Sequence, residues 1–390
     1  MCSSKCARLA SVVFSFLMAG LVAGFAGTVE AAPQASWTLQ QSLVKSGEVH
    51  SPTFISPTRG WAIVGSRLLQ TNDGGARWSI SLPAEWSADL PTAIAFSDPT
   101  HGWAVGRGFV MASTDSGAHW TQQALATAEN AEWVDVYAID AAHAFAVSTS
   151  GAVLGTDDGG VAWTMRFSAV GAVLRSVRFA DASHGWAVGA GADGGGLVLA
   201  TADGGTTWAR QPNPSPAELS AVCFVDALRG WAAGAGGVLR TADGGATWTS
   251  VDSPITASSS GPTVRASLAF VSATHGFLGA SEGATGLWET LDGGLTWKTS
   301  SPTAEPVHVH GLVALGSAHV LATGLSLPLG EELTTGSVWN WTQAPATMTP
   351  APQVGTTAVA KARVLAHAKA AARKAAQLRR ARAAAARRHH

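Results

Sequence analysis

Three carboxylates in the first half of the chain are, by residue type, the groups best suited to acid–base chemistry. Asp89, Glu132 and Asp135 are candidates for a pair in which one carboxyl protonates a glycosidic oxygen while the other acts as base or nucleophile. The sequence does not fix their separation, so a glycosidase stays open as an interpretation. We find no phosphate-binding loop, zinc-ligand spacing or Ser/His/Asp pattern, and we therefore expect no cofactor and no metal.

A second set of aspartates recurs at nearly even spacing. The pattern Ser/Thr-x-Asp-x-Gly-x-x-Trp occurs at residues 71–78, 113–120, 156–163, 201–208, 241–248 and 290–297. An incomplete seventh copy at 334–341 has Gly336 and Val338 where the Asp and the Gly are expected. Successive copies are 42, 43, 45, 40, 49 and 44 residues apart. A period of roughly 40–50 residues indicates a repeat architecture.

Each copy has the composition of a turn. A short Asp side chain accepts hydrogen bonds from nearby backbone N–H groups, and a Gly two residues later adopts positive φ at little cost. The Trp then enters the next strand and buries a large ring. We therefore predict a hairpin turn between two outer strands at each copy. The residues assigned this structural role are Asp73, Trp78, Asp115, Trp120, Asp158, Trp163, Asp203, Trp208, Asp243, Trp248, Asp292 and Trp297.

The repeated stretch resembles the Asp-box, or bacterial neuraminidase repeat. About a dozen residues before each box lies a Gly-Trp-Ala-Val-Gly-like run, clearest at 60–65, 102–106, 185–189 and 230–234. The combination is similar to the photosystem II stability/assembly-factor family of β-propellers, over roughly residues 50–341. The resemblance implies an all-β, seven-bladed propeller that acts as a non-enzymatic scaffold for protein binding and assembly.

Asp-box sialidases are similar to the chain only in the boxes. The sialidase family implies a tyrosine nucleophile paired with a glutamate, three arginines that grip the sugar carboxylate, and an acid/base aspartate. Tyr137 is the only tyrosine, and its neighbours alternate like a strand, so we expect its ring to pack between blades. The Arg-Ile-Pro-type segment of that family is absent. We therefore assign no catalytic residue.

The repeat unit divides into four short strands, and seven such units make a seven-bladed propeller. Strand one is an apolar run, strand two is the Gly-Trp-Ala-Val-Gly run, and the box connects strands three and four. The segment 36–38 looks like a fourth strand placed before the first unit. We predict that it pairs with the last blade and closes the ring, which removes an exposed edge. Cys223 lies in a probable innermost strand, where we expect a buried, inert thiol.

This arrangement gives the propeller two different faces. The box face carries the boxes and the turns between strands one and two, where we expect a recurring His or Arg to stabilise each turn. These residues are Arg59, His101, His143, His184, Arg229, His275 and His319. The loop face carries the other connections, and binding residues usually lie on such loops. The binding candidates on the loop face are Trp86, Asp89, Arg107, Glu132 and Trp133, the two tryptophans as exposed aromatic contacts.

The two ends of the chain differ from the propeller segment. Residues 1–31 have a basic start, an apolar stretch and small residues before position 32, which predicts a cleaved secretory signal and export. An uncleaved membrane anchor is the alternative. The propeller is expected over 32–341, a linker with three prolines over 342–358, and an Ala- and Arg-rich tail over 359–390 that is helical or disordered.

Charge is divided unevenly between these segments. The tail carries ten basic and no acidic residues, so the propeller segment carries about −12 within an overall charge of −1. This asymmetry favours a tether to anionic lipid, to an acidic wall polymer or to the propeller itself, with a solvated tail as the alternative. Export argues against nucleic acid. The photosynthetic members present an arginine-rich surface, so the acidic propeller departs from them.

We therefore interpret the sequence as an exported, monomeric, non-enzymatic propeller that binds a protein partner in the cell envelope. A cell-surface glycan-binding protein or Asp-box glycosidase is the alternative from a different class. Two or three carboxylates with raised pKa values in the central cleft of the loop face would favour that alternative.

Overall fold

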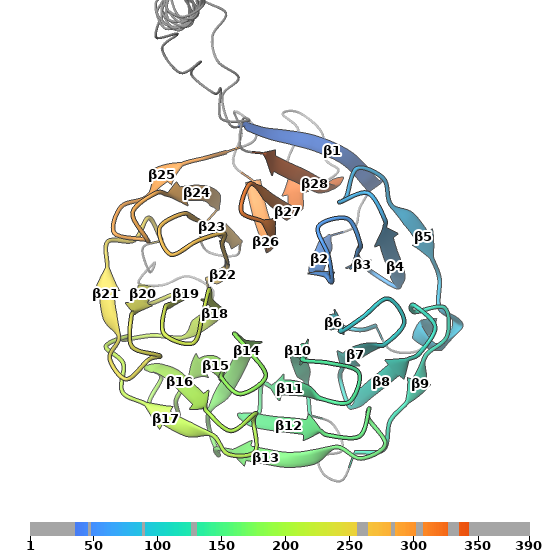
Figure 1. Cartoon of the computed structure of the whole chain (residues 1–390), viewed down its shortest axis with the longest axis horizontal. Helices are drawn as coiled ribbons and strands as arrows, with labels where there is room; N and C mark the ends of the chain where they lie inside the picture. The colour runs from blue at the N-terminus through green and yellow to red at the C-terminus, as the bar shows by residue number, and fades with distance from the viewer. Residues whose placement is uncertain are drawn as a thin grey trace, which may run out of the picture. The chain divides into compact units, whose positions relative to one another are not determined.

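The computed structural model describes residues 36–45, 48–87, 90–125, 131–255, 264–281, 285–301, 307–326 and 335–342. These residues form seven four-stranded sheets around a common centre, which confirms the all-β, seven-bladed propeller (Figure 1). Contacts within the chain gather the described residues into one compact unit, within Ala35–Ala346. The predicted signal segment, linker and basic tail lie outside the described residues.

Six blades follow chain order, with the first strand of each nearest the centre and the fourth at the rim (Figure 1). Blade 1 consists of β2 (Val49–Phe54), β3 (Gly60–Val64), β4 (Arg67–Thr71) and β5 (Ser79–Ser81). Blade 2 consists of β6 (Ala93–Phe96), β7 (Gly102–Gly106), β8 (Phe109–Ser113) and β9 (Thr121–Gln122). Blade 3 consists of β10 (Trp133–Ala138), β11 (Ala144–Ser148), β12 (Ala152–Thr156) and β13 (Thr164–Ser168). Blade 4 consists of β14 (Val173–Phe179), β15 (Gly185–Ala190), β16 (Gly196–Thr201) and β17 (Ala209–Gln211). Blade 5 consists of β18 (Leu219–Phe224), β19 (Gly230–Gly234), β20 (Gly237–Thr241) and β21 (Thr249–Val251). Blade 6 consists of β22 (Arg265–Phe270), β23 (Gly276–Ser281), β24 (Gly286–Thr290) and β25 (Lys298–Thr299). A 3-10 helix, η1 (Ala84–Ser87), follows β5. No helix within the described ranges has the length and apolar character needed to span a bilayer.

Blade 7 joins the two ends of the described chain. Its strands from the centre outward are β26 (Val307–Gly316), β27 (His319–Ser326), β28 (Thr335–Thr342) and β1 (Ser36–Lys45). Trp37 of β1 pairs with Trp341 of β28, so the prediction that segment 36–38 closes the ring is confirmed.

The predicted seventh box turn is wrong. Residues 335–342 run as one strand that pairs with β27 on one side and with β1 on the other. Gly336 and Val338 supply neither the carboxylate acceptor nor the second glycine that a box turn uses. The fourth strand of this blade comes from the other end of the propeller segment, so no turn is needed here.

The six complete boxes share one hydrogen-bond pattern. In the copy at 241–248, the Thr247 N–H donates to Asp243 Oδ1 at 2.9 Å, and the Thr241 hydroxyl donates to the same oxygen at 2.9 Å. That hydroxyl also accepts from the Gly245 N–H at 2.9 Å, and Gly245 has a φ of 87°. The equivalent contacts recur in the other five copies. Each box therefore ties the end of strand three to the start of strand four.

Tryptophans of strand two join neighbouring blades. The Trp231 ring on β19 stacks on Phe270 of blade 6, with centroids 3.5 Å apart and planes at 5°. Its indole N–H donates at 2.8 Å to the carbonyl of Gly293, in the box of blade 6. Trp61 and Trp186 make the same pair of contacts with the blades that follow them. These tryptophans are therefore packing residues.

An irregularity in the innermost strand explains the glycine that ends strand two. In blade 5 the register between β18 and β19 shifts between Leu219 and Ala221, which leaves Ser220 out of the ladder. A Cβ on Gly234 would lie 2.8 Å from the Leu219 Cα and would overlap the Glu218 carbonyl oxygen. The Ser220 hydroxyl accepts from the Ala266 N–H of blade 6 at 2.8 Å. The bulge thus frees a side chain that links two inner strands.

Candidate functional site

A polar pocket of about 360 Å³ lies at the junction of blades 2 and 3. Its lining residues are Arg107, Ala131, Glu132, Thr149 and Ser150. Arg107 follows β7, the pair Thr149 and Ser150 follows β11, and Ala131 and Glu132 precede β10. All five therefore come from the connections that define the loop face. We refer to this site below as the blade 2–3 pocket.

Backbone hydrogen bonds fix the frame of the blade 2–3 pocket. Arg107 and Glu132 face each other in an isolated antiparallel bridge between the two blades. The Gly108 N–H donates to the Ala131 carbonyl at 2.8 Å, and the Thr149 N–H donates to the Glu132 carbonyl at 3.0 Å. Three separate connections are thereby pinned to one another, so the lining side chains project from a rigid base.

The pocket combines both signs of charge with two hydroxyl groups. The side chains of Arg107 and Glu132 are exposed, and among the described residues no ion pair within 4 Å joins either of them to another group. The Thr149 hydroxyl donates to Glu132 Oε2 at 3.4 Å, and Ser150 Oγ lies 2.8 Å from Ser148 Oγ. Arg107 offers five N–H donors and Glu132 offers acceptor oxygens, so the site can hold a ligand that carries complementary groups.

The structure brings together two of the five predicted binding residues and corrects two others. Arg107 and Glu132 both line the pocket, whereas Trp86 and Trp133 are each 0% exposed and offer no aromatic surface for binding. Trp86, on η1, packs against Trp120 with ring centroids 5.3 Å apart. Each tryptophan lies off the repeat pattern because it fills space between blades. Asp89 lies outside the described residues.

Two pocket residues were not singled out from the sequence. Thr149 and Ser150 form the turn between strands two and three of blade 3, at the same end as Arg107. The sequence pattern already indicated that this turn lies on the loop face, because it connects strands two and three. Hydroxyl side chains in a Ser-Thr-Ser-Gly turn are, however, too common to mark a site without the neighbouring Arg and Glu.

The other side chains considered for chemistry lie on innermost strands, where their contacts are structural. Asp135 Oδ2 accepts from the Val177 N–H at 3.0 Å and from Arg178 Nη1 at 2.6 Å. The Tyr137 hydroxyl donates to the Phe179 carbonyl at 3.2 Å, and burial raises the pKa of this phenol. Cys223 lies on the innermost strand β18 at intermediate exposure, and desolvation raises the pKa of its thiol.

Several carboxyl groups within the described residues have clearly shifted pKa values. Every carboxyl whose pKa departs clearly from its ordinary value is shifted downward. A glycosidase acid of the usual kind needs the opposite shift, because it must hold a proton near neutral pH. The part of the chain that the structure describes also holds no group of three or more His, Cys, Asp or Glu residues arranged to bind a metal.

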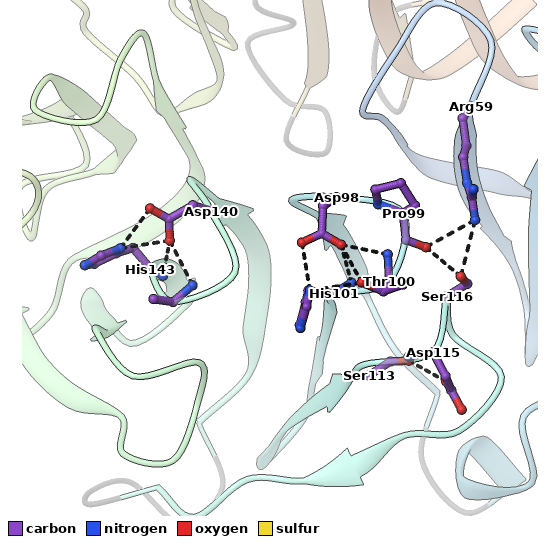
Figure 2. Close-up of polar contacts among 11 residues, drawn as sticks. Arg59, Asp98, Pro99, Thr100, His101, Ser113, Asp115, Ser116, Asp140 and His143 are labelled. Carbon is purple, nitrogen blue, oxygen red and sulfur yellow. Dashed lines mark hydrogen bonds and ion pairs between the residues drawn. The ribbon is translucent and has the colours of Figure 1, made fainter.

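The opposite, box face carries repeated polar contacts within its turns (Figure 2). His101 Nδ1 lies 2.7 Å from Asp98 Oδ2, and His143 Nδ1 lies 2.8 Å from Asp140 Oδ1. Blades 4 and 5 repeat this i, i+3 contact with Asp181–His184 and Asp226–Arg229. Arg59 instead reaches blade 2, where its Nη2 donates to the Pro99 carbonyl at 3.2 Å. The prediction of a turn-stabilising side chain is therefore confirmed for His101, His143, His184 and Arg229. It is wrong for Arg59 and for His275, whose Nε2 lies 2.8 Å from Glu289 Oε1 on β24. The Nε2 of His319 has no hydrogen-bond partner among the described residues.

The fold and the box turns define the class of protein, a β-propeller with repeated aspartate-containing turns. The chain belongs to the family described as photosynthesis system II assembly factor YCF48, whose model matches residues 29–176 and 169–264. A comparison with curated protein sequences returned no match.

Solved structures share the fold at low sequence identity. A structure titled "YCF48 bound to D1 peptide" is 19% identical with a TM-score of 0.61, covering 81% of this chain and 96% of the other. YCF48 from Cyanidioschyzon merolae is 19% identical with a TM-score of 0.59, covering 79% and 99%. A streptogramin B lyase structure is 10% identical with a TM-score of 0.57, covering 78% and 97%. Because a lyase also adopts this fold, the activity must be argued from the site.

Proposed function

We propose that this chain is an exported, non-enzymatic scaffold that binds a polar segment of a partner protein in the blade 2–3 pocket. The observation that carries the proposal is the pairing of Arg107 and Glu132 on a base fixed by backbone contacts, where neither side chain forms an ion pair with any other described residue. A preorganised base lowers the entropic cost of binding.

Family membership supports a protein as the ligand. The chain belongs to an assembly-factor family, and one protein of similar fold has been solved with a bound D1 peptide. The described carboxylates favour this proposal over the glycosidase, since Asp135 is engaged by Arg178 and the Val177 N–H. The signal predicted over 1–31 supports a partner in the cell envelope, and the ten basic residues of the tail support an additional contact with an anionic surface.

Capture of envelope proteins by the full mature chain tests the proposal. We expect specific proteins to be retained by the native chain and by Arg77→Glu, an equal charge change at an exposed position of a box turn. We expect Arg107→Glu to lose them. Capture that is identical for all three chains, or capture of glycan alone, would show that the pocket is not a protein-binding site.

The tail is tested in the same experiment with a chain whose ten basic residues between 361 and 388 are replaced by Gln. Proteins that depend on the pocket should remain bound to this chain. Material held by the tail should be lost, and should also be released from the native chain at high salt, because charge attraction between exposed groups is screened. If every captured protein disappears with the tail charges, the scaffold proposal is wrong.

A further inference from the structure

We infer that the blade 2–3 pocket recognises an extended peptide segment in which an acidic and a basic side chain are two residues apart. The inference rests on the proposed function, because it names the chemistry of the segment that the same pocket binds.

Arg107 and Glu132 are adjacent, yet in the described structure they form no ion pair with each other. As partners in an antiparallel bridge, their Cα atoms are separated by about 4.5–5.5 Å. No ion pair within 4 Å connects their side chains in the described structure. The Thr149 hydroxyl instead donates to Glu132 Oε2 at 3.4 Å, which draws the carboxylate toward blade 3. Two opposite charges therefore stand side by side, each with free bonding capacity.

The two charges of the pocket restrict the charge of its ligand. A simple anion would gain from Arg107 but would be repelled by the Glu132 carboxylate, and a simple cation would meet the reverse situation. A neutral ligand would leave both charged groups without a charged partner. A ligand with a carboxylate for Arg107 and a cation for Glu132 satisfies both, and a guanidinium–carboxylate contact has the strength of a charge-assisted pair.

The spacing of side chains in an extended peptide matches the spacing of Arg107 and Glu132. In an extended peptide, side chains i and i+2 point to the same face and lie about 6.6–6.8 Å apart. That separation is slightly larger than the Cα–Cα distance between the two bridge residues, a difference that the long side chains of Arg107 and Glu132 can span. A volume of about 360 Å³ admits a few side chains of this kind. The hydroxyl oxygens of Thr149 and Ser150, each already in one hydrogen bond, keep acceptor capacity for a backbone N–H of the peptide between the two charged residues.

Selection from a displayed library of random heptapeptides on the full mature chain tests this inference. We expect enrichment of Asp or Glu two positions from Lys or Arg, in one preferred order. Binding of the enriched peptide should fall about tenfold or more in Arg107→Glu and in Glu132→Lys. It should be unchanged in Arg77→Glu, and the two pocket variants should keep the native thermal transition.

The double variant Arg107→Glu/Glu132→Arg supplies the decisive comparison. It should bind the peptide in which the acidic and basic residues are exchanged, and bind it better than the original peptide. Enriched peptides without the acid–base pair, or a double variant that still prefers the original order, would overturn the inference. If envelope proteins are nonetheless captured in an Arg107-dependent way, only this inference fails. If neither peptide nor protein is bound, the proposed function fails as well.

Discussion

The aspartate of each box is held in its ionised form by the turn that it closes. The His119 backbone N–H, followed by the His119 side chain, lowers the pKa of Asp115 to about 2. The Thr296 hydroxyl and then its N–H lower the pKa of Asp292 to about 2. Asp115 is exposed and Asp292 has intermediate exposure, so each makes a small contribution to stability, but the pattern is repeated around the ring.

These shifts predict how stability depends on pH. A carboxyl with a depressed folded-state pKa stabilises the fold above its ordinary pKa of 3.8, and the contribution is lost as pH falls through the folded value of about 2. We expect the steepest fall in melting temperature between about pH 4 and 2. Between pH 7 and 5 we expect only a smaller decrease, because desolvation lowers the pKa of His50 and the unfolded chain therefore binds a proton there first. Calorimetry across this range checks it. An equal loss between pH 7 and 5 would contradict the assignment to the box aspartates.

Comparison of two tryptophans at different blade junctions separates the contribution of packing to stability from that of hydrogen bonding. The Trp231 indole donates to Gly293, whereas among the described residues the Trp103 indole N–H has no acceptor. Trp231→Phe should therefore cost about 1–2 kcal/mol more than Trp103→Phe, because it alone leaves a buried carbonyl without its donor. Urea unfolding of the two variants measures the difference. Equal losses would mean that the indole hydrogen bond adds nothing to the stacked ring.

At the residue scale, the sequence predicted the position of charged residues better than the exposure of aromatic ones. Arg107 and Glu132 were placed on the loop face because the strand pattern puts them after strand two and before strand one, and the structure places them there. Trp86 and Trp133 were misjudged because an aromatic residue that breaks a repeat has two explanations, a contact surface or a gap between blades. Sequence pattern cannot distinguish these, since the size of such a gap depends on how two blades pack.

At the scale of strands, the box spacing predicted six turns and the blade boundaries because each box carries its own hydrogen-bond groups. The inner-strand bulges were not predicted, because the extra residue is defined only by the register of its partner strand. Ser220 in blade 5 and Arg175 in blade 4 occupy such positions. The glycine opposite the bulge is the local trace of this feature in the sequence.

Gly234→Ala tests the bulge in blade 5. The added Cβ would collide with the backbone of Glu218 and Leu219, which cannot move aside as a flexible side chain would. We expect a loss of about 2–3 kcal/mol in urea unfolding. Gly195→Ala is the matched control, since its Cβ would meet no atom closer than 3.6 Å, and it should be nearly neutral. A neutral Gly234→Ala would mean that the register shift is not a fixed feature of the strand.

At the scale of the whole propeller, stability depends on a strand from the start of the described chain. Segment 36–38 was identified from the sequence because it repeats the fourth-strand pattern without the three strands that normally precede it. In the structure Trp37 packs edge-to-face on Phe277 of blade 6, with ring centroids 5.5 Å apart. Its indole N–H donates to Ser300 Oγ of the same blade at 3.1 Å. One side chain of β1 therefore holds the closing blade to its neighbour.

Trp37→Ala should accordingly weaken ring closure more than it weakens the remaining blades. We expect a loss of about 2–3 kcal/mol, less than for a fully buried tryptophan. Limited proteolysis followed by mass spectrometry should place the first cut in or next to β1, because a strand that loses its cross-blade anchor opens before the global transition. Trp61→Ala, at the buried junction of blades 1 and 2, is the control, and it should lower stability further without making β1 the first site of cleavage. If both variants are cut first at the same place, the ring opens at no particular blade, and closure by β1 is no weaker than any other junction.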